Sequence, residues 1–118
     1  DRVRFLGSVD DTTLVDLYAR CLGVVYPPFD EDYGYVTVEA FLARKPVVST
    51  PDAGGVLEFL EDGVSGYIAA APTPEALAEA IERLWSARSR APSLGEAGYQ
   101  RVQGITWSPI LDALTATL

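Results

Sequence analysis

The sequence contains no histidine and only one cysteine among its 118 residues. Histidine is the commonest general base and metal ligand in enzymes, so its absence removes the usual basis for acid–base and metal chemistry. The single cysteine, Cys21, excludes an intrachain disulfide or a zinc framework, and we expect it to be a buried structural thiol on an apolar helical face. We therefore expect no metal ion and no other cofactor.

Positive charge is also scarce. Nine Lys and Arg residues stand against seventeen Asp and Glu residues, which gives a net charge of −8, and Lys45 is the only lysine. This balance makes nucleic acid and anionic membrane surfaces poor partners for the chain. A ligand that carries phosphate would have to be held by groups close to it.

Long apolar runs are absent as well. No segment approaches the roughly 18 apolar residues of a membrane span, and no signal peptide opens the sequence. The expected setting is the cytoplasm, with membrane association left open for a full-length protein. The length fits one domain, for which about 100–200 residues are usual, and the 48% hydrophobic content favours a folded globule. Because the chain starts at Asp1 without a methionine and enters a predicted strand at once, we expect a domain cut from a longer protein.

Short apolar segments alternate with helical patterns along the chain. This alternation predicts an α/β fold with a parallel sheet and flanking helices. The predicted strands span 2–6, 22–26, 46–49 and 66–69. The predicted helices span 14–21, 35–43, 56–60, 73–85, 94–104 and 110–118.

The stretch from Pro27 to Lys45 places two carboxylates, Glu31 and Glu39, on either side of Gly34. In parallel α/β sheets, ligands collect beyond the carboxyl ends of the strands, where helix N-termini offer unpaired N–H groups and a partial positive charge to an anion. Carboxylates repel a phosphate, but they accept hydrogen bonds from sugar hydroxyls. The stretch therefore predicts a site for a ligand with phosphate between hydroxyl groups, which is the layout of a nucleotide sugar.

A simpler interpretation of the two glutamates remains open. Glu31 would be a solvated loop acid, and Glu39 would be an ordinary acid in the first turn of a helix, favoured by the helix dipole. For two glutamates alone this interpretation is preferable. The binding-site hypothesis depends on the match of the surrounding sequence.

The segment PPFDEDYGYVTVEA resembles the E-x7-E segment of retaining glycosyltransferases with the GT-B architecture of two Rossmann-like domains, specifically family 4, the glycosyl transferases group 1. The positions that fall on the family pattern without a gap are Pro27, Glu31, Gly34, Glu39 and Ala40. Two positions depart from that pattern, Pro28 and Asp32. The resemblance implies a Rossmann-like parallel sheet that forms part of a GT-B donor domain.

The resemblance also implies a role for each residue of this segment. Glu31 would lie beside the hydroxyls of the donor sugar, and Glu39 would hold the ribose diol. Three consecutive backbone N–H groups would face the sugar and the diphosphate: those of Gly34, Tyr35 and Val36. In this family the acceptor itself meets the leaving phosphate, so Glu31 would orient the donor, and no residue is assigned with certainty to catalysis.

Two further segments resemble the same family. In VRFLGSVDDTTLVDLYARC the turn after the first strand would approach the nucleobase, which makes Val9, Asp10 and Asp11 weaker candidates. The alternative is that Asp10 and Asp11 only begin a helix. In PVVSTPDAGGVLEFLEDGVSGYI the loop with Gly54 and Gly55 would come near the donor, or these glycines would serve only a tight connection.

The resemblance covers the later part of a C-terminal donor domain, so residues 1–118 would be a partial Rossmann-like domain that lacks its first strands. The family's Gly-Arg…Lys segment, which neutralises the diphosphate, and its N-terminal acceptor domain have no counterpart here, and Lys45 follows the helix at the wrong end. In the strand order 3-2-1-4-5-6, strand 2–6 would lie away from its neighbours. It would pair directly with strand 22–26, or a second copy of the chain would fill the gap and form a homodimer.

The predicted function is the nucleotide-sugar-binding part of a retaining glycosyltransferase. It would move a sugar from a UDP- or GDP-linked donor to a glycan or lipid acceptor. The 118 residues alone would bind the donor weakly and transfer nothing. The alternatives are a non-catalytic α/β scaffold or interaction domain and, fitting less well because no lysine follows Lys45, a receiver-like signalling module.

Overall fold

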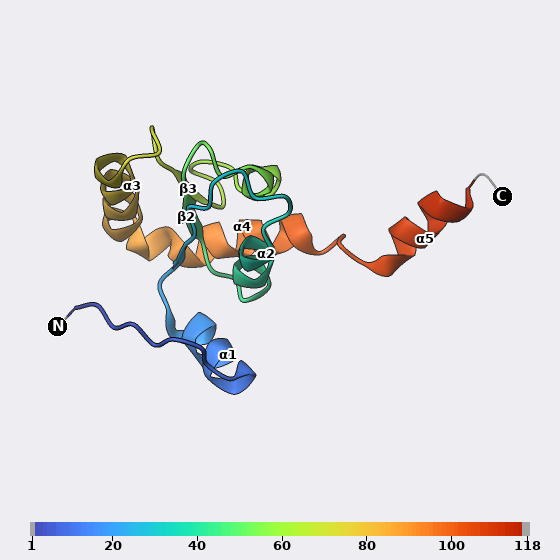
Figure 1. The fold of residues 1–118 in the computed structure, drawn as a ribbon, viewed down its shortest axis with the longest axis horizontal. Helices are drawn as coiled ribbons and strands as arrows, with labels where there is room; N and C mark the ends of the chain where they lie inside the picture. The colour runs from blue at the N-terminus through green and yellow to red at the C-terminus, as the bar shows by residue number, and fades with distance from the viewer. Residues whose placement is uncertain (1, 117–118) are drawn as a thin grey trace.

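The computed structural model describes residues 2–116, and its centre is a three-stranded parallel sheet (Figure 1). The strands are β1 (Val24–Val25), β2 (Val47–Ser49) and β3 (Gly66–Ile68), in the order β1-β2-β3. In the parallel register Val24 lies opposite Val47, and Val48 lies opposite Tyr67. The sheet confirms the predicted fold class and three of the four predicted strands.

Helices flank the sheet on both faces. The helices within residues 2–116 are α1 (Asp11–Arg20), α2 (Tyr35–Leu42), α3 (Pro74–Ser86), α4 (Ala91–Val102) and α5 (Trp107–Thr115), with single 3₁₀ turns η1 (Gly55–Glu58) and η2 (Arg88–Arg90). Helix α3 packs on β2 and β3, whereas α2 packs on β2 and on α4. Thr73 caps α3, because its side chain accepts a hydrogen bond from the Ala76 N–H.

Two apolar clusters form the core because adjacent residues of β2 point to opposite faces of the sheet. Val47 joins the cluster of α2 and η1, with Phe41 and Val56 among its members. Val48 joins the cluster of α3 and β3, which includes Leu84. The sheet is therefore covered on both sides, as the short, wholly apolar strand sequences predict.

The predicted strand at 2–6 is wrong. Residues 2–6 carry no strand, and the side chains of Val3 and Phe5 are 72% and 97% exposed. A strand leaves its ladder N–H and C=O groups unpaired unless a neighbour meets them, and within residues 2–116 only β2 pairs with β1. Direct pairing of 2–6 with 22–26 is therefore wrong as well, whereas pairing with a second copy stays a prediction.

Helix α4 begins at Ala91, three residues before the predicted start. The sequence pattern places Pro92 in a loop, but Pro92 occupies the first turn of α4. Proline is tolerated there because the first N–H groups of a helix have no intrahelical partner. Proline ends a helix at most other positions, and for this reason the sequence pattern predicts a start of α4 that is too late.

The last helix extends away from the sheet (Figure 1). It begins at Trp107, earlier than the predicted 110, and Thr117 and Leu118 of the predicted helix lie outside the described residues. None of its residues is buried. Its apolar side chains form an exposed strip made of Trp107, Ile110, Leu111 and Leu114. Within residues 2–116, no helix combines the length and apolar character needed to cross a membrane.

Candidate functional site

The loop that carries Glu31 is fixed to a neighbouring loop by backbone hydrogen bonds. The N–H groups of Asp30 and Glu31 donate to the carbonyl oxygens of Asp52 and Ala53, at 2.8 and 3.2 Å. The Gly55 N–H in turn donates to the Glu31 carbonyl oxygen at 2.6 Å. These bonds continue the parallel pairing of β1 and β2 beyond the strands, so Glu31 lies on a rigid edge at the carboxyl end of the sheet.

Gly34 ends this loop and serves as the N-cap of α2. Its φ and ψ of 79° and 58° are left-handed, and a Cβ atom would lie 2.9 Å from Cγ2 of Val56. Both features favour glycine. No side chain caps the helix, so the first N–H groups of α2, including those of Tyr35 and Val36, lack side-chain partners among the described residues.

Glu39 lies one turn into α2 and faces α1. Its Oε2 accepts a hydrogen bond from the Tyr18 hydroxyl at 2.9 Å. Burial, followed by the bond to Glu39, raises the pKa of Tyr18 to about 12. The two side chains line a cavity of about 510 Å³ between the helices, together with Asp11, Leu14, Val15, Ala19, Leu42 and Ala43.

Glu31 has a matching partner. Its Oε2 accepts a hydrogen bond from the Tyr26 hydroxyl at 2.9 Å, and this bond is the main reason that the pKa of Tyr26 is raised. Glu31 does not line the cavity that Glu39 lines. Each glutamate is thus held by its own tyrosine, Glu31 in the loop before α2 and Glu39 one turn into α2.

Gly54 and Gly55 lie against the Glu31 loop. A Cβ atom on Gly54 would lie 2.6 Å from the Glu31 carbonyl oxygen, and one on Gly55 would overlap the Asp32 carbonyl group. The backbone approach explains both glycines without a ligand. Because they allow the Glu31 loop to approach this closely, the two glycines still determine the position of Glu31 in the candidate site.

The three candidates for base contacts lie at the start of α1. Asp10 is the N-cap, and its Oδ1 accepts the Thr13 N–H at 2.8 Å. Hydrogen bonding to the Thr13 side chain, followed by that to the Thr13 N–H, lowers the pKa of the Asp10 carboxyl. Asp10 therefore begins α1, and its assignment to a base contact stays a prediction. Asp11 lines the cavity that contains Glu39, and Val9 is 37% exposed. Of the three, Asp11 is the one that lines the same cavity as Glu39.

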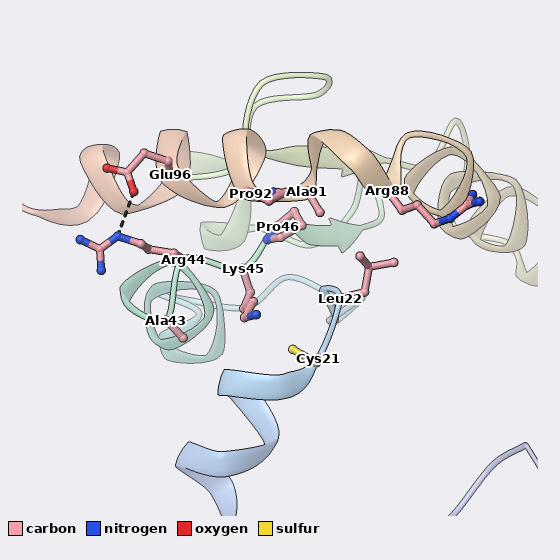
Figure 2. A pocket seen from close by; sticks show the side chains of 10 residues that line it. All are labelled: Cys21, Leu22, Ala43, Arg44, Lys45, Pro46, Arg88, Ala91, Pro92 and Glu96. Atoms are coloured by element: carbon pink, nitrogen blue, oxygen red, sulfur yellow. Dashed lines mark hydrogen bonds and ion pairs between the residues drawn. The ribbon is translucent and has the colours of Figure 1, made fainter.

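Lys45 lies at the other end of α2, in a cavity of about 440 Å³ at the amino ends of β1 and β2 (Figure 2). Helix α2 has eight residues, so this end lies about 12 Å from Gly34. Arg44, on the same cavity, pairs with Glu96 at 2.9 Å. Cys21 is half-buried here, at the C-cap of α1, and burial raises the pKa of its thiol. This placement agrees with the expectation that Lys45 stands away from the motif.

Sequence reasoning missed three residues around the motif: Tyr18, Tyr26 and Thr37. The two tyrosines mark only a helix face and a strand end in the sequence. Thr37 is fully buried in α2, and its Oγ1 has no hydrogen-bond partner among the described residues. No local pattern reveals these contacts, because each depends on how α1, β1 and α2 meet.

A parallel sheet covered on both faces, with a loop and a helix N-terminus at its carboxyl end, defines the class of Rossmann-like α/β domains. The chain belongs to the family Glycosyl transferases group 1, whose model matches residues 1–101. The predicted family is confirmed.

Individual proteins show the same similarity. Human alpha-1,3/1,6-mannosyltransferase ALG2 is 35% identical over 101 residues, which cover 86% of this chain and 24% of the human protein. Sucrose-phosphate synthase from Thermosynechococcus elongatus superposes with a TM-score of 0.83 at 29% identity, over 98% of this chain and 29% of the synthase. HepE from Anabaena, solved in complex with UDP and glucose, gives a TM-score of 0.79 at 30% identity, over 99% of this chain and 32% of HepE.

These similarities confirm the predicted GT-B-type fold class. The chain spans about a quarter of the length of the curated relatives it matches.

Proposed function

We propose that the chain is the donor-binding part of a longer retaining glycosyltransferase that moves a sugar from a UDP- or GDP-linked donor to a glycan or lipid acceptor. The observation that carries the proposal is the arrangement around α2. At the carboxyl end of the sheet, an uncapped helix N-terminus has one carboxylate, Glu31, in the loop that precedes it and another, Glu39, one turn into the helix. Membership of the Glycosyl transferases group 1 supports this assignment.

Each part of the arrangement suits one part of a nucleotide sugar. The N–H groups of Gly34, Tyr35 and Val36 would face the diphosphate and the sugar, with the helix dipole favouring the negative charge. The Glu31 carboxylate would accept hydrogen bonds from the sugar hydroxyls, and that of Glu39 from the ribose diol. Asp11, on the cavity beside Glu39, would lie near the base together with Val9. Gly54 and Gly55 would act on the donor through the Glu31 loop.

The chemistry follows from leaving-group stabilisation. Transfer breaks the bond between the anomeric carbon and the phosphate oxygen, and charge develops on the leaving diphosphate. The α2 N-terminus would stabilise that charge, and the acceptor hydroxyl would pass its proton to the leaving phosphate. The proposal includes no metal ion, and it places the reaction in the cytoplasm, as the composition predicts.

The 118 residues alone would bind the donor weakly and transfer nothing. Lys45, the only lysine, lies at the far end of α2 and does not reach a diphosphate at Gly34. The family's Gly-Arg…Lys segment, which would supply an arginine and a lysine to the diphosphate, has no counterpart in these residues. A charge-assisted hydrogen bond is worth roughly 1.5–3 kcal/mol, so the loss of these two bonds would weaken donor binding by about two to four powers of ten. Turnover by this chain in isolation would contradict the proposal.

Calorimetric titration of the longer enzyme with UDP-glucose and with GDP-mannose tests the site. Two similar proteins set the choice of ligands, since one is a mannosyltransferase and the other was solved with UDP and glucose. One donor should bind, and Glu39→Ala should weaken binding by at least about tenfold, the loss of one charge-assisted hydrogen bond. Glu79→Ala removes an exposed acid on α3 and is the matched control. If neither donor binds, or if both variants behave alike, the assignment fails.

A further inference from the structure

Two tyrosines outside the glutamate motif make the same contact. The Tyr26 hydroxyl donates to Oε2 of Glu31, and the Tyr18 hydroxyl donates to Oε2 of Glu39, each at 2.9 Å. Tyr26 directly follows β1 and Tyr18 lies on α1, whereas Glu31 lies in the loop after β1 and Glu39 on α2. Each of the two carboxylates is therefore held by a hydrogen bond from one tyrosine hydroxyl.

The Tyr26 hydroxyl is presented from a fixed position. Its ring packs against the core cluster that contains Phe41 and Val56. The Tyr26 N–H donates to the Val48 carbonyl oxygen at 2.9 Å, and the Tyr26 carbonyl oxygen accepts the Ser49 hydroxyl at 2.7 Å. The main-chain hydrogen bonds of Tyr26 and the packing of its ring leave the side chain little conformational freedom. The position of the Tyr26 hydroxyl therefore determines the orientation of the Glu31 carboxylate.

Tyr18 packs against the same cluster from α1. Helix α1 has no buried residue, and Tyr18 is its half-buried side chain. The bond to Glu39 therefore also joins α1 to α2. A role in holding the helix and a role in orienting the carboxylate make different predictions for ligand binding, although both predict a change in stability.

Each phenol engages only one oxygen of its glutamate. Among the described residues, Oε1 of Glu31 and Oε1 of Glu39 accept no hydrogen bond, and neither carboxylate forms an ion pair. A glutamate that is already held in one rotamer loses less conformational freedom when a ligand hydroxyl binds its other oxygen. The phenol would thus lower the cost of ordering the carboxylate.

We propose that Tyr18 and Tyr26 are positioning residues for the nucleotide-sugar donor, each holding one glutamate so that its second oxygen accepts a donor hydroxyl. The inference rests on the proposed function. It divides the two tyrosines between two parts of the ligand, because Glu39 is assigned to the ribose and Glu31 to the transferred sugar. Tyr18 therefore acts on the nucleotide, and Tyr26 acts on the sugar alone.

The test compares Tyr18→Phe and Tyr26→Phe in the longer enzyme, by calorimetry with UDP and UDP-glucose, or with GDP and GDP-mannose if that pair binds. Loss of a neutral donor typically costs about 0.5–1.5 kcal/mol, which corresponds to about 3- to 10-fold in affinity. Tyr18→Phe should weaken the nucleotide and the nucleotide sugar equally. Tyr26→Phe should weaken the nucleotide sugar and leave the bare nucleotide unchanged.

Tyr99→Phe is the matched control. Tyr99 lies on α4, and within the described chain its hydroxyl forms no hydrogen bond. This variant should bind both ligands as the wild type does. A purely structural role of the tyrosines would not separate nucleotide from nucleotide sugar, so the split between the two ligands is the readout that decides.

The outcomes separate the two proposals. If Glu39→Ala loses binding while both Tyr→Phe variants bind as the wild type does, the positioning role is wrong and the donor site stands. If a Tyr→Phe variant binds more tightly, the phenol competes with the ligand, and the positioning role is again wrong. If the wild type binds neither donor, both proposals fall. If Tyr18→Phe does not fold, the positioning role is decided by Tyr26→Phe alone, from its affinity for the nucleotide sugar compared with its affinity for the bare nucleotide.

A ligand-free measurement checks the contact itself. The absorbance titration of tyrosine in the 118-residue chain should show one phenol with a pKa of about 12. Glu39→Gln removes the charge that the phenol faces, so the pKa of Tyr18 should fall towards its ordinary value. A titration curve that does not change in the variant would overturn the Tyr18–Glu39 contact.

Discussion

The backbone N–H of Gly55 donates to the carbonyl oxygen of Glu31 at 2.6 Å, so the start of η1 and the Glu31 loop meet main chain to main chain. A Cβ atom at Gly55 would overlap the Asp32 carbonyl group. Gly55→Ala should therefore push the Glu31 loop outwards. The substitution should lower the free energy of unfolding by about 1–3 kcal/mol, as overpacking of a close contact does, and it should weaken donor binding through Glu31.

Urea denaturation of the chain measures the first effect. Gly104→Ala is the matched control, because a Cβ atom there meets nothing within 4 Å. The control should change the free energy of unfolding by less than about 0.5 kcal/mol. Equal midpoints for the two variants would show that the loops are not packed as closely in solution.

The residues around Gly34 show which features a sequence can predict. A glycine before an apolar helical run and two prolines after a strand act locally, so the frame of the loop follows from the residues themselves. The contact between Tyr18 and Glu39 joins residues 21 positions apart on two helices. It depends on the packing of α1 against α2, which no local pattern specifies.

Strand 2–6 failed for a related reason. Its alternation of polar and apolar residues is typical of a strand, but a strand forms only where a neighbour satisfies its backbone groups. The sequence pattern shows that residues 2–6 favour a strand, but it does not show whether another strand lies beside them. Gly54 and Gly55 are the opposite case, since the sequence allowed a ligand or a tight connection, and the structure gives a steric reason for both residues.

The second prediction concerns the buried hydroxyl of Thr37. Its side chain is fully buried in α2, and Oγ1 lacks a hydrogen-bond partner within the described chain. Removal of a buried, unsatisfied polar group recovers part of its desolvation cost. Thr37→Val keeps the branched shape and should raise the free energy of unfolding by about 1 kcal/mol.

Chemical denaturation of wild type and Thr37→Val measures this gain. Thr12→Val, at an exposed position of α1, is the control for the change in side-chain chemistry and should have little effect. A marked loss of stability in Thr37→Val alone would indicate that the hydroxyl has a bonding partner in solution, such as a buried water.

The third prediction concerns the ion pair between Asp62 and Arg83. The guanidinium donates to both carboxylate oxygens at 3.1 Å, and the Ile68 N–H donates to Oδ1 at 2.7 Å. The bond from Arg83 lowers the pKa of Asp62 below 3.8, against the effect of burial. The stabilisation is therefore present above about pH 3.8 and is lost as the pH falls through the lower pKa of the folded state.

Asp62→Asn should reveal this dependence. Both side chains are nearly half exposed, at 45% for Asp62 and 47% for Arg83, so the variant should lose only about 1 kcal/mol at pH 7. The difference from the wild type should shrink below pH 3.8, where the wild-type carboxyl also becomes neutral. Thermal unfolding at several pH values measures it, with the exposed Asp112→Asn as control. A difference that is constant with pH would contradict the assigned cause.

The last prediction concerns the exposed apolar strip of α5. Trp107, Ile110, Leu111 and Leu114 recur at helical spacing and are 47–76% exposed, and no residue of α5 is buried. An amphipathic helix with an uncovered apolar face tends to associate, so the 118-residue chain should form dimers or larger species at high concentration. A chain that ends at Gly104 keeps the buried Val102 and should retain the thermal midpoint while it associates less. Sedimentation velocity and calorimetry of the two chains measure both effects, and Leu111→Ser with Leu114→Ser should reproduce the reduced association without truncation.

Asp112→Ser, which leaves the apolar side chains intact, is the matched control. A lower thermal midpoint in the truncated chain would mean that α5 packs on the body of the domain in solution, because a helix without buried residues contributes little to the free energy of unfolding.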